Sequence, residues 1–212
     1  RILMDEGSAP QPKTMRLNEI AATGGGGQQI QYLYDANGNQ TKRIEGLKEE
    51  TFGYDYANRL VSYVRTVSAV LESAHLYQFM PTGERLKKLN IQTTATTWSM
   101  YDGPDVVSDY QTSSSSPGFE LGPKYVNALG IDSKIARIDP SGAKFFYTGD
   151  ALRSATQLVD SSQSVINQYL TTAWGEDLID QRPVPDRYGF SQREKDAESG
   201  LQHFRARSFD PR

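Results

Sequence analysis

The stretch YLYDANGN, residues Tyr32–Asn39, places two tyrosines two positions apart and follows them with an Asp-x-x-Gly sequence. Residues two apart on a strand point to the same face, so Tyr32 and Tyr34 are predicted to share one face of a sheet. Asp35 and Gly38 occupy the first and fourth positions of a turn, where the carboxylate accepts backbone N–H groups and glycine tolerates a left-handed conformation. The stretch therefore predicts a strand, a type I turn and a returning strand.

The same pattern recurs along the chain at intervals of about twenty residues. In the second copy Phe52 and Tyr54 are the paired rings, Asp55 opens the turn, and Asn58 stands where the first copy has glycine. Asparagine is the next most tolerant residue for a left-handed conformation. The third copy has the rings Tyr77 and Phe79 and the turn glycine Gly83, and later turn positions are predicted at Asp102, Gly142 and Gly175.

A period of about twenty residues accommodates two strands of about six residues and two turns, so that each repeat is one hairpin. A single hairpin is marginal in water, whereas successive hairpins that pair edge to edge form an antiparallel sheet that buries one face. A β-propeller blade needs about 40 residues, so that architecture fits the spacing less well. The sequence predicts an all-β fold of repeated antiparallel hairpins.

The composition argues against several classes of site. The chain has 212 residues and a net charge of −3, and its basic residues are scattered, which disfavours nucleic acid as a partner. It lacks cysteine, which excludes thiolate metal sites, disulfides and cysteine nucleophiles, and its two histidines are too few for a histidine-rich metal site. Neither a nucleophile elbow nor a phosphate loop occurs. We expect no cofactor, no metal and no enzymatic activity for this chain.

The ends of the sequence and its apolar runs give two further expectations. No apolar run approaches the roughly 20 residues of a membrane helix, so we expect no membrane span. The first residue is Arg1, without a basic and apolar leader behind it, and the sequence stops abruptly at Arg212. The chain is therefore expected to be a piece of a longer protein.

Two segments are predicted to be loops, namely Gly24–Gly27 and Ser113–Gly118, because glycine and serine runs are too flexible or too polar for a strand interior. Strand patterning resumes on both sides of each, which favours wider turns within one architecture over linkers between independent domains. Helical signals are weak. A short helical turn is expected within Asp150–Leu158 and within Gln192–Gly200.

Several segments follow one another in a characteristic order. YDANGNQ at Tyr34–Gln40 has the form YDxxGN, and NRL at Asn58–Leu60 and ERL at Glu84–Leu86 correspond to a following Gly-Arg-Leu. Together with the segments below they resemble the Rhs or YD-repeat family. A single repeat is a weak motif, whereas the ordered set covers most of the chain and is far more specific. The segments similar to the family's core region are Ala136–Asp139, Phe146–Ser154 and Tyr188–Arg212.

The resemblance implies a large spiralling β-sheet that closes into a hollow shell. In bacterial members such a shell encloses a C-terminal toxin, in insecticidal toxin complexes it pairs with a partner protein, and in animal teneurins it serves adhesion. By this resemblance, residues 1–140 would be YD-repeat hairpins and residues 141–212 a core region truncated at its C-terminal end. The expected partners are the rest of the shell, a cargo domain and a delivery-system protein, in a secreted, cell-surface or contact-delivered bacterial protein.

The resemblance also implies part of a self-cleavage site of the aspartic type. Asp210 matches the first aspartate of the family's pattern, and the sequence ends before the second, so the half-site cannot catalyse alone. Arg205 and Arg207, expected on one strand face with His203 and Phe209, would orient Asp210. The alternative for these arginines is a cross-strand charge ladder with the acidic residues Glu194, Asp196 or Glu198.

Two alternatives remain for the repeat residues. Asp35, Asp55 and Asp102 have the types of calcium ligands or catalytic acids, although their spacing is explained by turn capping. Aromatic hairpin repeats of about twenty residues also occur in cell-wall-binding solenoids, whose rings stack on sugars or choline. Glycan or surface binding is therefore the alternative to an encapsulating scaffold. Those solenoids rely on tryptophan, whereas this chain has two, Trp98 and Trp174.

Overall fold

The computed structural model describes residues 2–4, 17–20, 29–113, 115 and 118–211, and side chains are described from residue 29 onward. The loop predicted at Gly24–Gly27 lies outside the described residues, and so does half of the loop predicted at Ser113–Gly118. The chain divides into two compact units. Unit 1 comprises residues 1–77 and 90–92, and unit 2 comprises residues 78–89 and 93–212.

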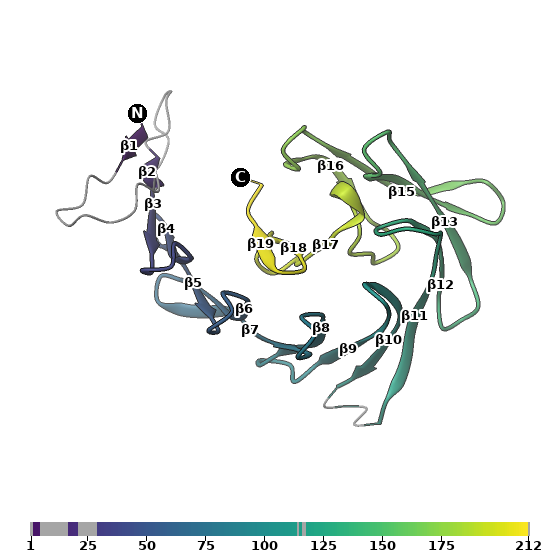
Figure 1. Cartoon of the computed structure of the whole chain (residues 1–212), viewed down its shortest axis with the longest axis horizontal. Helices are drawn as coiled ribbons and strands as arrows, with labels where there is room; N and C mark the ends of the chain where they lie inside the picture. Colours follow the sequence, from purple (N-terminus) through teal and green to yellow (C-terminus); the bar gives the residue numbers. More distant parts are fainter. Residues whose placement is uncertain (1, 5–16, 21–28, 114, 116–117, 212) are drawn as a thin grey trace. The chain divides into compact units, whose positions relative to one another are not determined.

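In each unit the strands form an antiparallel sheet in which neighbours follow sequence order. The predicted all-β fold of repeated antiparallel hairpins is confirmed, and Figure 1 shows the strands in chain order. Unit 1 contains β1 (Ile2–Met4), β2 (Leu17–Ile20), β3 (Ile30–Tyr34), β4 (Gln40–Glu45), β5 (Lys48–Tyr54), β6 (Leu60–Val67) and most of β7 (Val70–Phe79).

Unit 2 has a long sheet and a small one. The long sheet contains β8 (Arg85–Asn90), β9 (Thr96–Asp102), β10 (Asp105–Thr112), β11 (Glu120–Asn127), β12 (Lys134–Ile138), β13 (Lys144–Gly149), β14 (Ala155–Asp160), β15 (Val165–Thr171) and β16 (Asp177–Gln181). The small sheet contains β17 (Glu194–Lys195), β18 (Gln202–Phe204) and β19 (Arg207–Phe209), and the 3-10 turn η1 (Phe190–Gln192) precedes it.

The core of unit 1 is built from rings on one face of its sheet. Tyr32, Phe52 and Tyr77 are 6%, 3% and 2% exposed, whereas Leu33, on the opposite face of β3, is 42% exposed. Phe52 packs against Tyr63 with ring centroids 5.5 Å apart. This burial follows from the period-2 alternation of a strand, which sends every second side chain to the same face. Three other predicted face residues, Tyr34, Tyr54 and Phe79, are partly buried.

A buried polar pair lies beside these rings. The carboxylate of Glu50 is 1% exposed and accepts a hydrogen bond of 2.8 Å from the hydroxyl of Tyr63. The Nε atom of Arg43 lies 2.9 Å from Glu50 Oε2. A buried carboxylate is stable only when a charge or hydrogen-bond donors compensate its lost hydration, and Tyr63 and Arg43 supply both.

The repeated turns have one hydrogen-bond pattern. Asp35 Oδ1 accepts the N–H of Asn37 at 2.9 Å and of Asn39 at 2.8 Å, and the Asp35 carbonyl accepts the N–H of Gly38 at 3.1 Å. Partial burial opposes the charge of Asp35, but the hydrogen bonds from Asn39 and Asn37 outweigh it and lower its pKa. Gly38 has a φ of 86°, the left-handed conformation that closes a three-residue hairpin loop with a bulge.

The turn at Asp55 has the same geometry. Its Oδ1 accepts the N–H groups of Ala57 and Arg59, each at 2.9 Å, and Asn58 has a φ of 59°. The two turns are also joined, because Asn58 Oδ1 accepts hydrogen bonds from Asn37 Nδ2 at 3.1 Å and Asn39 Nδ2 at 2.8 Å. The turn aspartates thus act as hydrogen-bond acceptors within their own loops.

Other turns vary this pattern. Gly83, Gly142 and Gly175 have φ values of 108°, 85° and 84°, and each donates its N–H to the carbonyl three residues earlier. Asp102 differs, because it ends β9 at a two-residue Gly103-Pro104 turn and faces Asp105 across the hairpin. No backbone hydrogen bond to the Asp102 carboxylate is found in the described part of the chain.

Two expectations for helical turns are wrong. Within Asp150–Leu158 the chain forms a turn and then β14, because Asp150 Oδ1 accepts the N–H groups of Leu152 and Ser154 as the other turn aspartates do. The turn was hard to recognise from the sequence, because Arg153 rather than glycine occupies its left-handed position, with a φ of 64°. Within Gln192–Gly200 only the end of η1 is helical, and β17 and a tight turn follow.

Residues 182–204 belong to unit 2 because they pack on one face of the sheet formed by β8 to β15. We call this the inner face of unit 2 and the opposite side its outer face. The chain divides into its compact units after Tyr77, and the division into repeat hairpins (residues 1–140) and a core region (residues 141–212) stays a prediction. Within unit 2, contacts of β8 and β10 with the C-terminal residues join the segments before and after residue 140.

Candidate functional site

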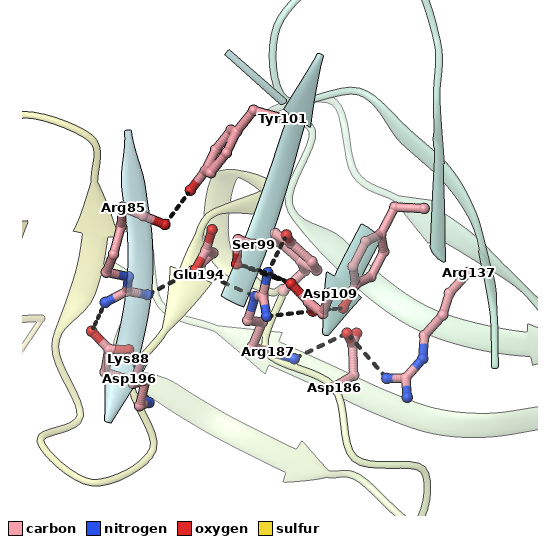
Figure 2. Close-up of polar contacts among 12 residues, drawn as sticks. Arg85, Lys88, Ser99, Tyr101, Asp109, Arg137, Asp186, Arg187, Glu194 and Asp196 are labelled. Atoms are coloured by element: carbon pink, nitrogen blue, oxygen red, sulfur yellow. Dashed lines mark hydrogen bonds and ion pairs between the residues drawn. The ribbon is translucent and has the colours of Figure 1, made fainter. Parts of the chain in front are cut away.

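A large polar cluster of unit 2 lies where residues 182–204 pack on the inner face of the sheet (Figure 2). Its side chains come from strands β8 to β13 and β15 of the sheet and from the C-terminal segment. We call it the inner-face network. It joins residues that are far apart in the sequence, and nearly all of them are charged or carry a hydroxyl group.

Arg85 is the first anchor of the network. Its Nη1 donates to Asp196 Oδ2 at 2.6 Å and its Nη2 donates to Glu194 Oε2 at 2.7 Å, so that the planar guanidinium holds two carboxylates at once. Lys88, three residues further along β8, donates to Asp196 Oδ1 at 3.1 Å and to Glu198 Oε2 at 2.6 Å. These contacts fix β17 and its following turn onto β8.

The two carboxylates stay ionised despite their burial. Burial alone would raise the pKa of Glu194, but Arg187 and Arg85 outweigh it and lower the pKa to about 2. The same competition, with Arg85 and Lys88 as the cations, holds the pKa of Asp196 well below its usual value. Buried charges of this kind are retained only in the presence of their partners.

Arg187 is the second anchor. Its Nη1 and Nη2 donate to the two carboxylate oxygens of Asp109 at 2.7 and 3.1 Å, the bidentate arrangement that suits a guanidinium and a carboxylate. Ser99 Oγ donates to Asp109 Oδ1 at 2.9 Å. The hydroxyl of Tyr125 donates to Asp109 Oδ2 at 3.3 Å. Asp109 on β10 is 1% exposed, so these neighbours compensate the hydration that its charge loses on burial.

Aromatic rings surround the second anchor. Tyr125 and Tyr188 pack edge to face with centroids 5.1 Å apart, and Tyr188 also contacts Tyr147 at 6.4 Å. The guanidinium of Arg187 lies 5.2 Å from the Tyr188 ring, and the ammonium of Lys134 lies 4.0 Å from it on a cation–π contact. Burial raises the pKa of the Tyr188 hydroxyl well above its usual value, so the ring stays neutral.

Asp186 forms a third junction. Its two oxygens accept hydrogen bonds from the hydroxyl of Tyr147 at 3.0 Å and from the hydroxyl of Tyr169 at 3.1 Å. Arg137 Nη1 lies 3.6 Å from Asp186 Oδ1 and also donates to the carbonyl of Pro185. Figure 2 shows Asp186 between Arg137 and the rest of the network. The segment 185–188 is therefore held to β12, β13 and β15 by side-chain contacts.

A cleft of about 300 Å³ lies between the C-terminal segment and the inner face. Its lining includes Arg85, Lys88, Asp109, Arg137, Asp186 and Asp196, which already pair with one another or with adjacent groups. The charged groups of the network pair with one another, and these ion pairs hold the C-terminal segment on the inner face of the sheet. No cluster of three or more carboxylates or imidazoles suited to a metal ion is found among the described residues.

The residues predicted for self-cleavage lie elsewhere. Asp210 follows β19 directly and is partly buried, and its catalytic role stays a prediction. Arg205 and Arg207 were expected on one strand, but Arg205 and Ala206 form the turn between β18 and β19, and Arg205 has a φ of 53°. That turn separates Arg205 from the strand face of His203. Arg207 opens β19 and is exposed.

The expected charge ladder between these arginines and the acidic residues is also wrong. Arg205 Nη2 donates to Asp132 Oδ1 at 3.0 Å and lies 3.9 Å from Asp105 Oδ1. The three acidic residues are bound instead by the cations of β8, because the hairpin of β17 and β18 faces that strand. They are Glu194, Asp196 and Glu198.

Most of the inner-face network escaped sequence reasoning. A charged residue inside an aromatic and β-branched strand, such as Asp109 next to Tyr110, was the available local signal. Its partner Arg187 is 78 positions away and lies in a segment rich in proline and charge. Without the fold, nothing in the sequence pairs these two residues.

The fold consists of antiparallel hairpin repeats, and a C-terminal segment docks on one face of the sheet through the inner-face network. A TcdB2-TccC3-TEV crystal structure matches with a TM-score of 0.59 and 13% identity, over 87% of this chain and 12% of the other. The Tc holotoxin pore of Photorhabdus luminescens with a TccC3 variant matches with a TM-score of 0.56 and 13% identity, over 87% and 11%. The predicted resemblance to Rhs or YD-repeat proteins is confirmed by this shared fold.

A third structure bears on which part is shared. TcdB2-TccC3 without its hypervariable C-terminal region matches with a TM-score of 0.50 and 11% identity, over 95% of this chain and 16% of the other. The shared fold is therefore present in a structure that lacks that region.

A sequence relative points to the same class. The tRNA3(Ser)-specific nuclease WapA of Bacillus spizizenii is 25% identical over 182 residues, which cover 84% of this chain and 7% of the nuclease. The chain thus spans a small fraction of the length of this relative and of the structures above. No protein-family model matches the chain. No helix among the described residues has the length and apolarity needed to cross a membrane.

Proposed function

We propose that the chain forms part of the wall of a Rhs-type shell that encloses a toxin or effector cargo, in a bacterial protein that is secreted or delivered by contact. The observation that carries the proposal is the ordered run of antiparallel hairpins, which shares its fold with TccC3-containing complexes over 87% of the chain. The proposed mechanism is enclosure, in which the sheet separates a cargo polypeptide from the surroundings until release.

The inner-face network supports this function because a wall must keep its docked segments in place without help from the cargo. Arg85 of β8 donates hydrogen bonds to two carboxylates of the C-terminal segment. Arg187 of that segment donates hydrogen bonds to the carboxylate of Asp109 on β10. The charges on this face are satisfied by one another. A cargo chain would therefore meet an inner face whose ion pairs are already formed, which favours containment over tight binding.

Glycan binding, the alternative function, is less well supported. Stacking on a sugar requires exposed ring faces. The repeat rings Tyr32, Phe52 and Tyr77 are almost fully buried in the core of unit 1. These rings stabilise the sheet, and they are not accessible as a repeated stacking platform.

The test uses the full-length natural protein. Electron microscopy is expected to show a hollow particle, and limited trypsin digestion is expected to spare the polypeptide that the shell encloses. The double variant Arg85→Met with Lys88→Met should release this protection, because it leaves buried carboxylates unpaired. Lys42→Met, which removes an exposed pair with Glu49, is the matched control and should keep it.

Three results would contradict the proposal. One is a solid or fully extended particle. Another is a cargo segment that trypsin cleaves as fast in the wild-type protein as in the Arg85→Met and Lys88→Met variant. The third is specific retention on a glycan or cell-wall column with no hollow particle, which would favour surface binding.

A further inference from the structure

The outer face of unit 2 carries a continuous row of apolar side chains that crosses five adjacent strands. The register pairs Val126 with Ala136, Ala136 with Phe146, Phe146 with Val159, and Val159 with Val165. We call these five residues the outer apolar row. Val126, Phe146 and Val165 are 44%, 43% and 51% exposed. Isolated exposed apolar residues are common, but a contiguous row of them marks an interaction site.

The row lies on the face opposite to the inner-face network. Its strand neighbours Tyr125, Phe145 and Leu158 are 6%, 9% and 0% exposed and belong to the buried inner side. Successive residues of a strand point to opposite faces, so Val126, Phe146 and Val159 point away from that core. The register of β14 and β15 shifts between Leu158 and Val159, and the pairing of Val165 with Val159 across this irregularity puts Val165 beside the row. Ala136, 7% exposed, is covered by its neighbours in the row.

The borders of the row differ in charge. On one side, two residues along each strand from the row, the register pairs Ile138 with Lys124 and with Lys144. The side chains of both lysines are exposed. On the other side the register pairs Thr148 with Gln157, which are uncharged. The row thus has a basic border and a neutral polar border.

The geometry of the row selects the kind of partner. The backbone groups of β11 to β15 already pair with the neighbouring strands on both sides, so a partner must bind through side chains rather than by adding a strand. Four strand spacings of about 4.8 Å give a length of roughly 19 Å. A helix of about 13 residues has that length at a rise of 1.5 Å per residue and presents one apolar stripe.

We propose that the outer apolar row is the docking site for an amphipathic helix of a partner protein, with acidic residues along the flank that faces Lys124 and Lys144. The apolar stripe of the helix covers Val126, Phe146 and Val165, and its carboxylates pair with the two lysines. The charge of the basic border sets the orientation of the helix across the strands. The proposal is independent of the cargo-enclosure function, because it concerns the opposite face of the sheet.

The test measures binding of synthetic helical peptides to the full-length natural protein by fluorescence anisotropy. One probe carries leucines at helical spacing and glutamates along one flank, and the second has lysines in place of the glutamates. The wild-type protein is expected to bind the glutamate peptide at least about tenfold more tightly than the lysine peptide. Reversing the border with Lys124→Glu and Lys144→Glu should reverse that preference.

Row variants separate docking from folding. Val126→Thr with Phe146→Thr places a β-branched side chain at both strand positions and should weaken binding of the glutamate peptide by about tenfold or more. Leu170→Thr, a matched control on an exposed apolar residue of β15 outside the row, should leave binding within about twofold. An unchanged thermal unfolding transition in the border variant, the row variant and the Leu170→Thr control shows that each retains the fold.

The proposal is overturned if neither peptide binds, if both bind equally, or if the row variants bind as the wild-type protein does. It is also overturned if the row variants abolish self-association of the protein while peptide binding is absent, which would assign the row to a second copy. Binding to anionic lipid vesicles that depends on Phe146, without peptide binding, would assign it to a membrane surface and equally reject a helical partner.

Discussion

Arg85 and Asp196 lie 111 positions apart in the sequence, yet Arg85 Nη1 is 2.6 Å from Asp196 Oδ2 and both side chains are buried. The same guanidinium holds Glu194 at 2.7 Å. Lys88, also on β8, donates to Glu198 Oε2 at 2.6 Å. The C-terminal hairpin of β17 and β18 is therefore held on β8 by the side chains of Arg85 and Lys88 together.

Arg85→Met is expected to destabilise the chain by up to about 3–5 kcal/mol, because it removes one cation from each of two buried carboxylates and leaves Glu194 with Arg187 alone and Asp196 with Lys88 alone. Denaturant unfolding monitored by tyrosine and tryptophan fluorescence measures the loss. Lys42→Met removes an exposed ion pair with Glu49 and should cost no more than about 1 kcal/mol. Equal losses for the two variants would show that the Arg85 fork adds nothing beyond a surface pair.

His203 makes the stability of unit 2 dependent on pH. Burial and then Arg85 lower its pKa from 6.5 to about 4, against the opposite effect of Glu194 and Asp196. The unfolded chain binds a proton below pH 6.5, whereas the folded chain stays unprotonated until about pH 4. Stability should therefore fall as the pH decreases from 6.5 to about 4, by at most roughly 3 kcal/mol.

The measurement is the free energy of unfolding at a series of pH values for wild type and His203→Gln. The free energy of unfolding of His203→Gln should decrease less than that of the wild type between pH 6.5 and about 4. His75→Gln, which changes the other histidine, should retain the decrease that His203 causes. A His203→Gln profile parallel to that of the wild type between pH 6.5 and about 4 would contradict the assignment.

The Asp35 turn allows a test of its two components. Asp35→Ala removes the acceptor of two backbone N–H groups and should cost about 1–2 kcal/mol, as loss of a comparable cap does. Gly38→Val should cost more than Gly38→Asn, because no atom lies within 4 Å of an added Cβ and the penalty comes from a φ of 86° alone. Asn58 already adopts a φ of 59° in the equivalent turn.

These three variants are compared by thermal unfolding. Asn tolerates the left-handed conformation, so Gly38→Asn should lie within about 1 kcal/mol of the wild type. A variant series in which Val and Asn behave alike at position 38 would mean that the turn conformation does not limit stability.

Gly175 and Gly142 form a matched pair, since their φ values are 84° and 85°. A Cβ at Gly175 would meet Phe190 Cδ1 at 2.8 Å, whereas nothing lies within 4 Å of one at Gly142. Both alanine variants have the same backbone strain of about 1 kcal/mol, and Gly175→Ala should lose about 1–3 kcal/mol more through overpacking. Denaturant unfolding measures the free energy of unfolding of both variants. Equal decreases in this free energy would exclude a tight contact between Gly175 and Phe190.

The local elements were predictable because their causes are local. The alternation around Tyr32 and Tyr34, the Asp35 and Asp55 turns and the hairpin period depend on residues within a few positions of one another. The Asp150 turn was missed for a local reason as well, since Arg153 occupies the left-handed position that glycine or asparagine usually marks.

The sequence by itself determined the hairpin repeat, the turns and the resemblance to Rhs or YD-repeat proteins. Only the tertiary structure decided which charges meet, and it placed Glu194 and Asp196 on Arg85 rather than on Arg205. The physical reason is that a hairpin specifies its own turn and register through neighbours in the chain. The partner of a buried charge depends instead on which strand the hairpin packs against, and that choice is made by the fold.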